Sequence, residues 1–228
     1  MKKQCLYLIF LLSISVGYAQ SLNMLPNSRN VFIDGRANFT APKDSIANNE
    51  IKGSRFLGDD SYHSGELWTL KGYYKNQMAY RFDQFERTVE VKLPSGKEML
   101  LDENDILILK IFIKNQYISF KQVTLPNEKN KALIQVIYES PTLQLLRDSK
   151  KIITYNRGQN VYEFENAYQF YIVRGQNNPL DKIQISVKSL TKVFPSKRSK
   201  IESFFKSKKS KKELTLSKLA DLMRKLDE

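Results

Sequence analysis

Short apolar stretches separated by polar breaks run along most of the chain, and their spacing predicts a β-sheet. Between Gly53 and Lys188 these stretches recur about every ten residues, which is typical of consecutive strands. No segment between them has the length and period of a crossover helix, so antiparallel pairing is expected. The pattern predicts a mainly β domain over residues 53–188, built as an antiparallel meander, a sandwich or a half-barrel.

The alternation of side chains is clearest at Thr88–Lys92. Apolar and polar residues alternate there, which predicts that Val89 and Val91 face a core. Shorter apolar runs predict further strands at Leu67–Leu70, Met78–Phe85, 132–138, 142–146, 151–155, 161–165, 167–173 and 182–187. In the last of these, strand alternation places Ile183 and Val187 on one face.

Residues Ile106–Ile113 form the most apolar run of the predicted sheet. Every position except Lys110 is apolar, which predicts a central strand that is covered on both faces. The polar pair Asn115-Gln116 follows and predicts a tight turn into a strand at Tyr117–Phe120. Together these segments predict a hairpin.

After Lys188 the period of the apolar residues changes to that of a helix. Pro195 is suited to a first helical turn, and a narrow apolar stripe follows it. Two helices are expected, at about 196–207 and 215–226, docked on the sheet or on each other. Their apolar stripes are formed by Ile201, Phe204 and Phe205 and by Leu216, Leu219, Ala220, Met223 and Leu226.

The first 19 residues have the pattern of a signal peptide. Lys2 and Lys3 precede the apolar run Leu6–Val16, and Gly17-Tyr18-Ala19 offers small residues to a signal peptidase. The apolar run is shorter than the roughly 20 residues that a membrane-spanning helix needs. The pattern predicts cleavage after Ala19 and export to the periplasm or beyond, with a retained membrane anchor as the alternative.

Residues 20–52 resemble a leader or linker, with one short apolar stretch, Val31-Phe32-Ile33, that could pair as a strand. The only cysteine, Cys5, precedes the apolar run, so the position argues against a lipoprotein. After cleavage the chain would have no thiol, which excludes a disulfide and a thiolate metal site. No second apolar run reaches transmembrane length.

The basic residues are concentrated toward the C-terminus. The whole chain has a formal net charge of +13. Residues 188–228 hold 13 Lys and Arg against 5 Asp and Glu (+8), whereas residues 20–187 hold 22 against 19 (+3). Because an exported protein rarely meets nucleic acid, we expect anionic lipid, anionic glycan or an acidic envelope protein as the partner, with simple solvated helix faces as the alternative. The predicted contact residues are Lys206, Lys208, Lys209, Lys211 and Lys212.

The single histidine, His63, lies close to Asp60 and Ser61, which are the residue types of a hydrolytic triad. These residues fall within four positions of one predicted loop, whereas a triad needs side chains that converge from separate elements. The same loop lacks the spacing of a transition-metal site, and a calcium site at Asp59 and Asp60 is a weaker alternative. No glycine-rich phosphate loop is present. No catalytic, metal or cofactor-binding residue is therefore predicted.

Two groups of aromatic residues lie in the predicted sheet. Aromatic side chains favour strands in any case, so we interpret them mainly as core, with a lining for a lipid or glycan as the alternative. The first group is Tyr73, Tyr74, Tyr80, Phe82 and Phe85, and the second is Tyr162, Phe164, Tyr168, Phe170 and Tyr171.

Several segments resemble a family of exported Bacteroidota proteins that has no assigned activity. They are Gly53-x-x-Phe56-Leu57, Tyr80-Arg81-Phe82-Asp83-Gln84-Phe85, Val89-Glu90-Val91-Lys92 and Leu190-x-x-x-Phe194-Pro195 before a lysine-rich helix. The resemblance covers most of the chain from Gly53 onward. It implies export and a β module followed by C-terminal helices, and it supplies no catalytic residues.

The sequence therefore favours a non-catalytic exported envelope protein, in which a β-scaffold binds a partner protein or an anionic envelope component. A carrier that holds an apolar or lipid ligand in the concave face of its sheet is the first alternative. A hydrolase that uses two carboxylates is the second, because glycosidases need no histidine.

Overall fold

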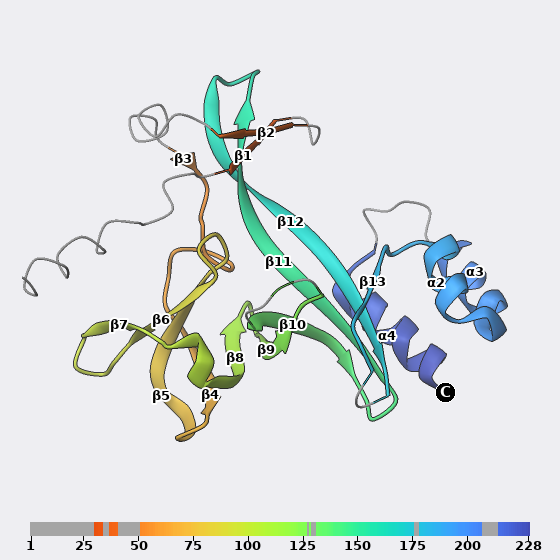
Figure 1. The fold of residues 1–228 in the computed structure, drawn as a ribbon. Helices are drawn as coiled ribbons and strands as arrows, with labels where there is room; N and C mark the ends of the chain where they lie inside the picture. The colour runs from red at the N-terminus through yellow and green to blue at the C-terminus, as the bar shows by residue number, and fades with distance from the viewer. Residues whose placement is uncertain are drawn as a thin grey trace, which may run out of the picture.

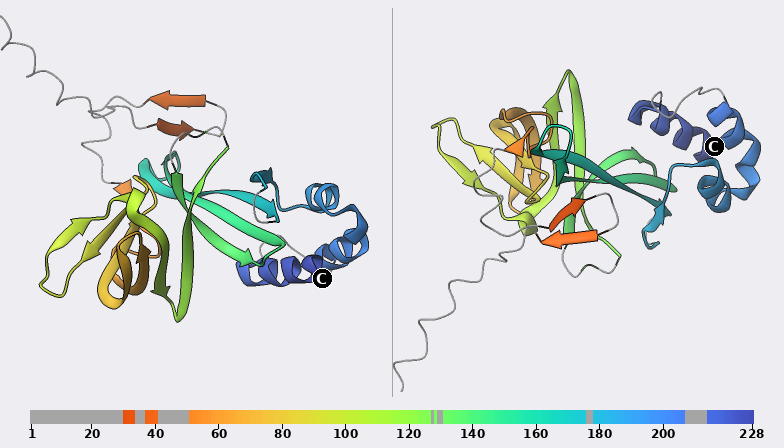
Figure 2. Two further views of the ribbon diagram at one scale, coloured as in Figure 1. Left: turned by 60° about the horizontal axis from the view of Figure 1, so that its bottom comes forward. Right: turned by 90° about the horizontal axis from the view of Figure 1, so that it is seen from above.

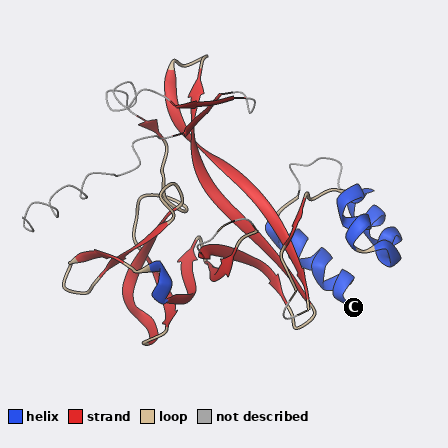
Figure 3. Cartoon of the chain, viewed as in Figure 1, coloured by secondary structure: helices blue, strands red, loops and turns tan. Residues whose placement is uncertain are grey.

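The protein is described by a computed structural model that defines residues 30–33, 37–40, 51–126, 128, 131–175, 178–206 and 214–228. Within these residues it is mainly β, with one open mixed sheet and three α-helices near the C-terminus (Figures 1 and 3). The predicted fold class is confirmed. The predicted signal peptide at 1–19 and most of the predicted leader at 20–52 lie outside the described residues.

The elements follow the predicted order, with strands first and helices last. The strands are β1 (Asn30–Ile33), β2 (Ala37–Thr40), β3 (Ile51–Lys52), β4 (His63–Thr69), β5 (Gly72–Asp83), β6 (Thr88–Lys92), β7 (Glu98–Leu100), β8 (Ile106–Ile113), β9 (Gln116–Thr124), β10 (Lys131–Glu139), β11 (Leu143–Asn156), β12 (Val161–Arg174) and β13 (Asp181–Ile183). The helices are α2 (Val187–Val193), α3 (Arg198–Lys206) and α4 (Leu216–Asp227), with 3₁₀ turns η1 (Glu103–Asp105) and η2 (Pro195–Lys197).

The main series of the sheet runs in the order β13-β12-β11-β10-β9-β8-β4-β5-β6-β7. Every neighbouring pair in this series is antiparallel, as predicted. The leader segment adds β1 as a parallel partner of β11 and β3 as a parallel partner of β12, which makes the whole sheet mixed. The predicted strand at Val31-Phe32-Ile33 is confirmed by β1, which also forms a hairpin with β2.

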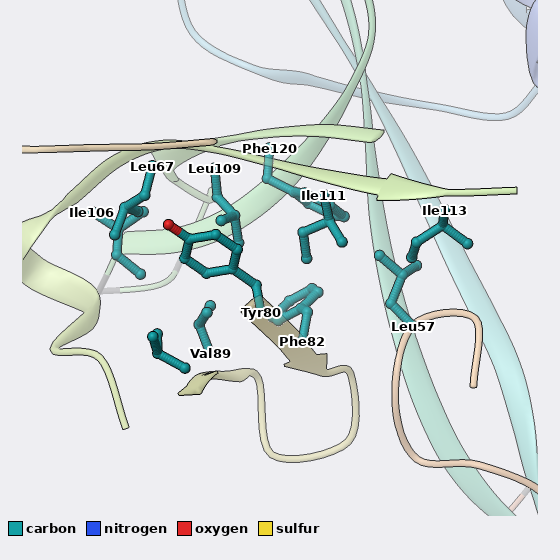
Figure 4. Close-up of a cluster of buried hydrophobic side chains, with 11 residues drawn as sticks. Leu57, Leu67, Tyr80, Phe82, Val89, Ile106, Leu109, Ile111, Ile113 and Phe120 are labelled. Carbon is teal, nitrogen blue, oxygen red and sulfur yellow. The ribbon is translucent and has the colours of Figure 1, made fainter. Parts of the chain in front are cut away.

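Strands β4, β5 and β6 curve back over β8 and β9 and enclose a first hydrophobic core (Figure 4). The rings of Phe82 and Phe120 meet edge to face across this core, with centroids 5.2 Å apart. The β5–β6 turn also reaches β11, because the backbone N–H of Lys151 donates a hydrogen bond to the carbonyl of Gln84 (3.1 Å). The core is formed by Leu57, Leu67, Tyr80, Phe82, Val89, Val91, Ile106, Leu109, Ile111, Ile113 and Phe120. Side chains thus fill the concave space of this half-barrel.

Two predictions for individual strands have opposite outcomes. The alternation in β6 is confirmed, because Val89 and Val91 are at most 1% exposed. The prediction that β8 is covered on both faces is wrong. Its inner residue Leu109 is fully buried, whereas Ile108 and Phe112 on the other face are 39% and 38% exposed. No element packs over that outer face in the described part of the chain, so its apolar side chains meet only their neighbours on adjacent strands.

The β8–β9 hairpin turns at Lys114-Asn115, one residue earlier than predicted. Both residues have positive φ (48° and 63°), which is the conformation of a two-residue type I′ turn. Ile113 then pairs directly with Gln116, which already belongs to β9. The turn was displaced in the prediction because a lysine at a positive-φ position carries no sequence signal of its own.

Strands β11 and β12 form a long hairpin that connects the two ends of the molecule (Figures 1 and 2). Each strand has 14 residues, so four short predicted strands merge into two. The half-barrel lies on one side of this hairpin and the helices gather at one end of it. The predictions were fragmented because polar residues such as Lys150 and Lys151 interrupt the apolar pattern in the middle of β11.

The helices form a second core with the end of the sheet. Helices α3 and α4 confirm the two predicted helices, and Pro195 begins η2 just before α3. Helix α2 was not predicted. Strand β13 ends at Ile183, and Ser186 then caps α2 by accepting a hydrogen bond from the N–H of Ser189 (3.2 Å). Val187 therefore begins a helix, and the predicted strand at 182–187 is corrected to 181–183.

Candidate functional site

Helix α4 docks on the sheet through a single apolar stripe. Its residues Leu219, Leu222, Met223 and Leu226 are at most 4% exposed and belong to one cluster with side chains of β11, β12 and β13. Each fully buried side chain of this size contributes about 1.5–3 kcal/mol to stability. Because this stripe fixes the rotation of the helix about its axis, the basic residues on its other faces are directed away from the core.

A groove of about 580 Å³ lies between α3 and α4. Lys200, Lys218 and Lys225 line it with positive charge, while Phe204 and the buried Leu222 supply apolar surface. A lining that combines lysines with apolar side chains is suited to a ligand that has both an anionic group and an apolar part.

Two acidic residues, Asp221 and Glu228, also line the groove. Asp221 is engaged by Arg224, whose Nη1 lies 2.8 Å from the carboxylate. Lys200 is held in place because its Nζ donates a hydrogen bond to the carbonyl of Lys225 (3.1 Å), at the negative end of the α4 dipole. The charge of Asp221 is thus partly balanced within α4, and the groove lining contains three lysines against two acids.

The surface beside the groove is also basic. The hydrogen bond and the charge of Arg198 lower the pKa of Glu202, which lies one helical turn further along α3 and only 2.7 Å from it. Glu202 is therefore already paired. Lys188, Lys192 and Lys206 are exposed and have no ion-pair partner among the described residues.

The structure locates only one of the predicted contact residues. Lys206 is the exposed last residue of α3. Lys208, Lys209, Lys211 and Lys212 lie outside the described residues, in the connection between α3 and α4. The groove lysines were missed by the sequence interpretation, which followed the charge run and could not show that α3 and α4 lie side by side.

The histidine loop does not form a catalytic arrangement. Nε2 of His63 lies 3.2 Å from Asp59, and the same carboxylate accepts a hydrogen bond from the backbone N–H of Ser61 (2.8 Å), which lowers its pKa. Asp60 instead accepts a hydrogen bond from the hydroxyl of Ser54 (2.7 Å). Within the described residues, no group of three or more His, Cys, Asp or Glu side chains could hold a metal ion.

Three of the four segments that resemble the exported family meet around Arg81, whereas Leu190 and Phe194 of the fourth lie in the helical core. The guanidinium of Arg81 pairs with Glu90 on the adjacent strand β6, and its carbon Cζ lies 4.1 Å from the ring centre of Phe56 and 4.4 Å from that of Tyr62. Cation–π contacts of this kind hold the segment before β4 against the β5–β6 hairpin.

Asp83 supports the same hairpin from its turn. It is fully buried, pairs with Arg55, and accepts hydrogen bonds from the backbone N–H groups of Phe85 and Glu86 (2.9 Å each). The motif residues therefore have structural roles that the chain can fulfil without a substrate.

The other two buried acids are also paired with cations. Glu66 is 8% exposed and lies 3.6 Å from Lys75 and 3.7 Å from Lys110. Asp148 is 3% exposed and lies 3.2 Å from Arg87 and 3.3 Å from Lys150. Carboxylates that are paired with two cations in this way are typical of structural ion pairs.

A second surface of interest is the uncovered side of β4, β5, β8 and β9, which we call the open face. Its aromatic and aliphatic residues are Trp68, Tyr73, Ile108, Phe112 and Tyr117, and the ion-paired Glu66, Lys75 and Lys110 lie on the same face. Trp68 stacks on Tyr73 with ring centroids 4.5 Å apart, and Phe112 meets Tyr117 at 5.1 Å. Tyr73 and Tyr117 are nevertheless 46% and 49% exposed. Exposed apolar patches of this kind are typical of interaction sites.

The predicted aromatic groups divide between core and surface. Tyr80 and Phe82 lie in the first core, Phe170 packs against the helical core, and Tyr171 belongs to a third cluster on the opposite face of the long hairpin. Tyr168 is 50% exposed. The interpretation as core is therefore confirmed for Tyr80, Phe82 and Tyr171, whereas Tyr73 and Tyr168 lie on the surface.

Among the described helices, none has the length and apolar character required to cross a membrane. The fold and its sites define a mainly β protein whose open sheet carries a basic helical unit at one end. Comparison with protein-family models, with curated proteins and with solved structures finds no match for this chain.

Proposed function

We propose that the protein is a non-catalytic exported protein of the cell envelope, whose β-scaffold presents a basic helical unit to an anionic envelope component. The observation that supports this function is the groove between α3 and α4, which is lined by three lysines and by apolar side chains. A phospholipid or a lipopolysaccharide would place its phosphate among the lysines and its acyl chain against Phe204 and Leu222.

The proposal depends on export, which the pattern at residues 1–19 favours. The protein isolated from the envelope of its host is expected to begin at Gln20 when its mass is measured. Unprocessed protein in the cytosolic fraction would contradict the proposed location, and nucleic acid would then become the first partner to test.

Vesicle binding tests the groove directly. The purified chain is expected to float with vesicles that contain phosphatidylglycerol but not with vesicles of phosphatidylcholine alone, and high salt should release it. Each lysine near an anionic surface is worth about 1 kcal/mol, so a variant with Lys200, Lys218 and Lys225 changed to Gln should bind roughly 100-fold more weakly.

A matched control removes the same charge elsewhere. Lys52, Lys97 and Lys182 are exposed residues of the sheet and its turns, and their change to Gln should leave most of the binding intact.

A third variant changes Lys206, Lys208, Lys209, Lys211 and Lys212 to Gln and tests the predicted contact residues beside the groove. Unchanged vesicle binding by the groove variant would refute the assignment to the groove, and equal losses in the groove variant and the control would show only a general charge effect.

The filled half-barrel supports a scaffold over a lipid carrier. Tyr80, Phe82 and Phe120 are at most 3% exposed and occupy the concave space where a carried ligand would have to lie (Figure 4). The paired state of the buried acids Glu66 and Asp148 likewise supports a non-catalytic protein over a hydrolase.

The open face supports a partner protein as a second candidate. Crosslinking in the native envelope, followed by mass spectrometry, should capture a partner through this surface. A variant with Ile108 and Tyr117 changed to Glu should lose the captured partner while it keeps vesicle binding, because both residues lie on the open face and outside the groove. Retention of the same partner by this variant would exclude the open face as its binding surface.

A further inference from the structure

Strand β11 carries a half-buried arginine that has only neutral partners. Nε and Nη2 of Arg147 both donate hydrogen bonds to Oε1 of Gln135 (3.0 and 2.6 Å), and its Cζ lies 4.7 Å from the ring centre of Tyr168. No carboxylate contacts this guanidinium among the described residues. A cation that is withdrawn from water without an opposite charge destabilises a fold unless something else supplies that charge.

Two further polar groups extend from the same face of β11. Ser149 and Lys151 follow Arg147 at two and four positions, and residues at this spacing share one face of a strand. Ser149 is 8% exposed, and its hydroxyl has no hydrogen-bond partner in the described structure. Lys151 is half-buried and likewise has no acceptor there, and burial alone lowers its pKa. Burial also lowers the pKa of Arg147.

The residues of β10 and β12 that lie opposite this strip in the sheet are uncharged. Gln135 of β10 and Phe170 of β12 lie opposite Arg147, Tyr168 lies opposite Ser149, and Asn166 lies opposite Lys151. The nearest acid along the strand, Asp148, belongs to the other face, where Arg87 and Lys150 pair with it. The β5–β6 turn also lies beside Lys151, and its two acids, Asp83 and Glu86, are both paired with Arg55. Arg147 and Lys151 therefore have no ion-pair partner among the described residues.

We propose that Arg147, Ser149 and Lys151 form a binding site for a phosphoryl group. Arg147 and Lys151 are four residues apart, which corresponds to roughly 13 Å along a strand. Their long side chains can lean toward each other and both contact a tetrahedral anion above Ser149, which lies between them. Two cations balance the charge of a phosphate monoester, which carries about −1.5 to −2 at neutral pH. Gln135 holds Nε and Nη2 of Arg147 and leaves Nη1 for the ligand. A rotation of the Ser149 side chain adds a hydroxyl donor.

This site is separate from the groove between α3 and α4, so each can be tested without the other. Thermal unfolding of the purified chain is measured in sodium phosphate and in sodium chloride of equal ionic strength. A melting temperature about 5 °C higher is expected at a phosphate concentration near 100 times Kd. Lys151→Gln should abolish this shift, whereas Lys97→Gln, which changes an exposed turn residue, should keep it.

Arg147→Met provides a second and stricter readout. Combined with Gln135→Leu, which removes the buried acceptor that would otherwise lose both of its hydrogen bonds, it should raise the melting temperature without phosphate and remove the response to phosphate. If Arg147 had only a structural role, its replacement would lower the melting temperature measured without phosphate.

Two ligand arms identify the source of the phosphoryl group. Equal shifts with inorganic phosphate and with short-chain phosphatidic acid below its micelle concentration support a site for phosphate alone, and a larger shift with the lipid supports a lipid-borne phosphate. The same melting temperature in phosphate and chloride overturns the proposal, as does a shift that Lys151→Gln retains or a shift produced by succinate and not by phosphate. Because the groove lysines would also attract phosphate, the shifts are measured in the groove variant as well, and the part of the shift that Lys151→Gln removes should be the same in both backgrounds.

Discussion

Replacing Tyr80 by Phe should make the protein more stable. The side chain of Tyr80 is 0% exposed within the first core, and its hydroxyl is buried without a hydrogen-bond partner in the described structure (Figure 4). A buried hydroxyl without a partner costs about 1–3 kcal/mol relative to the apolar equivalent. Because the ring contacts remain, Tyr80→Phe should gain about 1 kcal/mol at neutral pH, which corresponds to about 2–4 °C in Tm for a chain of this size.

The same substitution should change how stability depends on alkaline pH. Burial raises the pKa of Tyr80 from 10.0 to about 12, so the unfolded chain loses this proton at a lower pH than the folded chain does. The contribution of this raised pKa to the free energy of unfolding is fully present below pH 10 and is lost as the pH rises from about 10 to about 12. The slope approaches 1.4 kcal/mol per pH unit. The stability gap between Tyr80→Phe and wild type should therefore widen by about 1 kcal/mol between pH 9 and pH 11.

Urea unfolding, followed by the fluorescence of Trp68 and by circular dichroism at pH 7, 9 and 11, measures both effects. Tyr62, whose pKa burial also raises to about 12, is present in both proteins and cancels in the comparison. Tyr117→Phe is the matched control, because Tyr117 is 49% exposed and should change stability by less than about 0.5 kcal/mol. A Tyr80→Phe protein that is less stable at pH 7, or a gap that does not widen with pH, would refute the reasoning.

Three further substitutions test the contacts that define the fold, each by urea unfolding against wild type. Gly65→Ala should cost about 3 kcal/mol, because the new Cβ would lie 2.3 Å from the carbonyl oxygen of Lys110 on the adjacent strand; a neutral result would contradict the close approach of β4 and β8. Asp83→Ala should cost about 3 kcal/mol through the lost ion pair and turn hydrogen bonds, and Asp83→Asn should cost less. Asp227→Asn should lower the free energy of unfolding by about 1 kcal/mol at pH 7, because it weakens the attachment of α4. Hydrogen bonds from Ser140, Thr142 and Tyr138 lower the pKa of Asp227, so its contribution should vanish as the pH falls through and below 3.8, and a gap that persists there would count against this contact.

The sequence predicted the elements better than their surroundings. The alternation at Val89 and Val91 located a buried face correctly, because a period of two fits a half-buried strand and does not fit a helix. The continuous apolar run of β8 was misleading, because Ile108 and Phe112 look the same in the sequence whether a layer covers them or not. What covers a face depends on elements that are distant in the chain, and a single strand contains no information about them.

Helix α2 shows a second limit of the sequence pattern. Ile183, Ile185 and Val187 alternate as a strand would, yet Ser186 begins a helix. Ser186 can cap a helix, with the polar residue Ser189 three positions after it, and this was the available sequence signal for α2. The strand-like alternation over residues 182–187 was the more evident pattern and led to the wrong prediction. Local hydrogen bonding by Ser186 and docking of Leu190 in the helical core decide the outcome.

The candidate sites differ in how far a sequence could have revealed them. The excess of lysines near the C-terminus indicated an anionic partner, but the groove needs Lys200 of α3 beside Lys225 of α4, and no periodicity predicts that contact. Arg147 gave no signal at all, because an arginine in a strand is ordinary until its lack of an acid partner is visible.

The positions of the cores explain why the binding surfaces lie on the outside of this molecule. Adjacent residues of β11 serve different cores, with Leu145 in the helical core and Leu146 in the cluster on the opposite face, while the half-barrel fills its own interior. One sheet thus supports three small cores in place of a single large one, and between them it leaves stretches of strand that no layer covers. The open face is such a stretch, and the half-buried strip around Arg147 belongs to none of the three cores. In a chain that needs the sheet only as a scaffold, exposed aromatic residues and uncompensated cations there would be a burden on solubility and stability. Their presence on the sheet, outside the helical unit, is the physical reason to expect that the sheet itself binds a ligand or a partner.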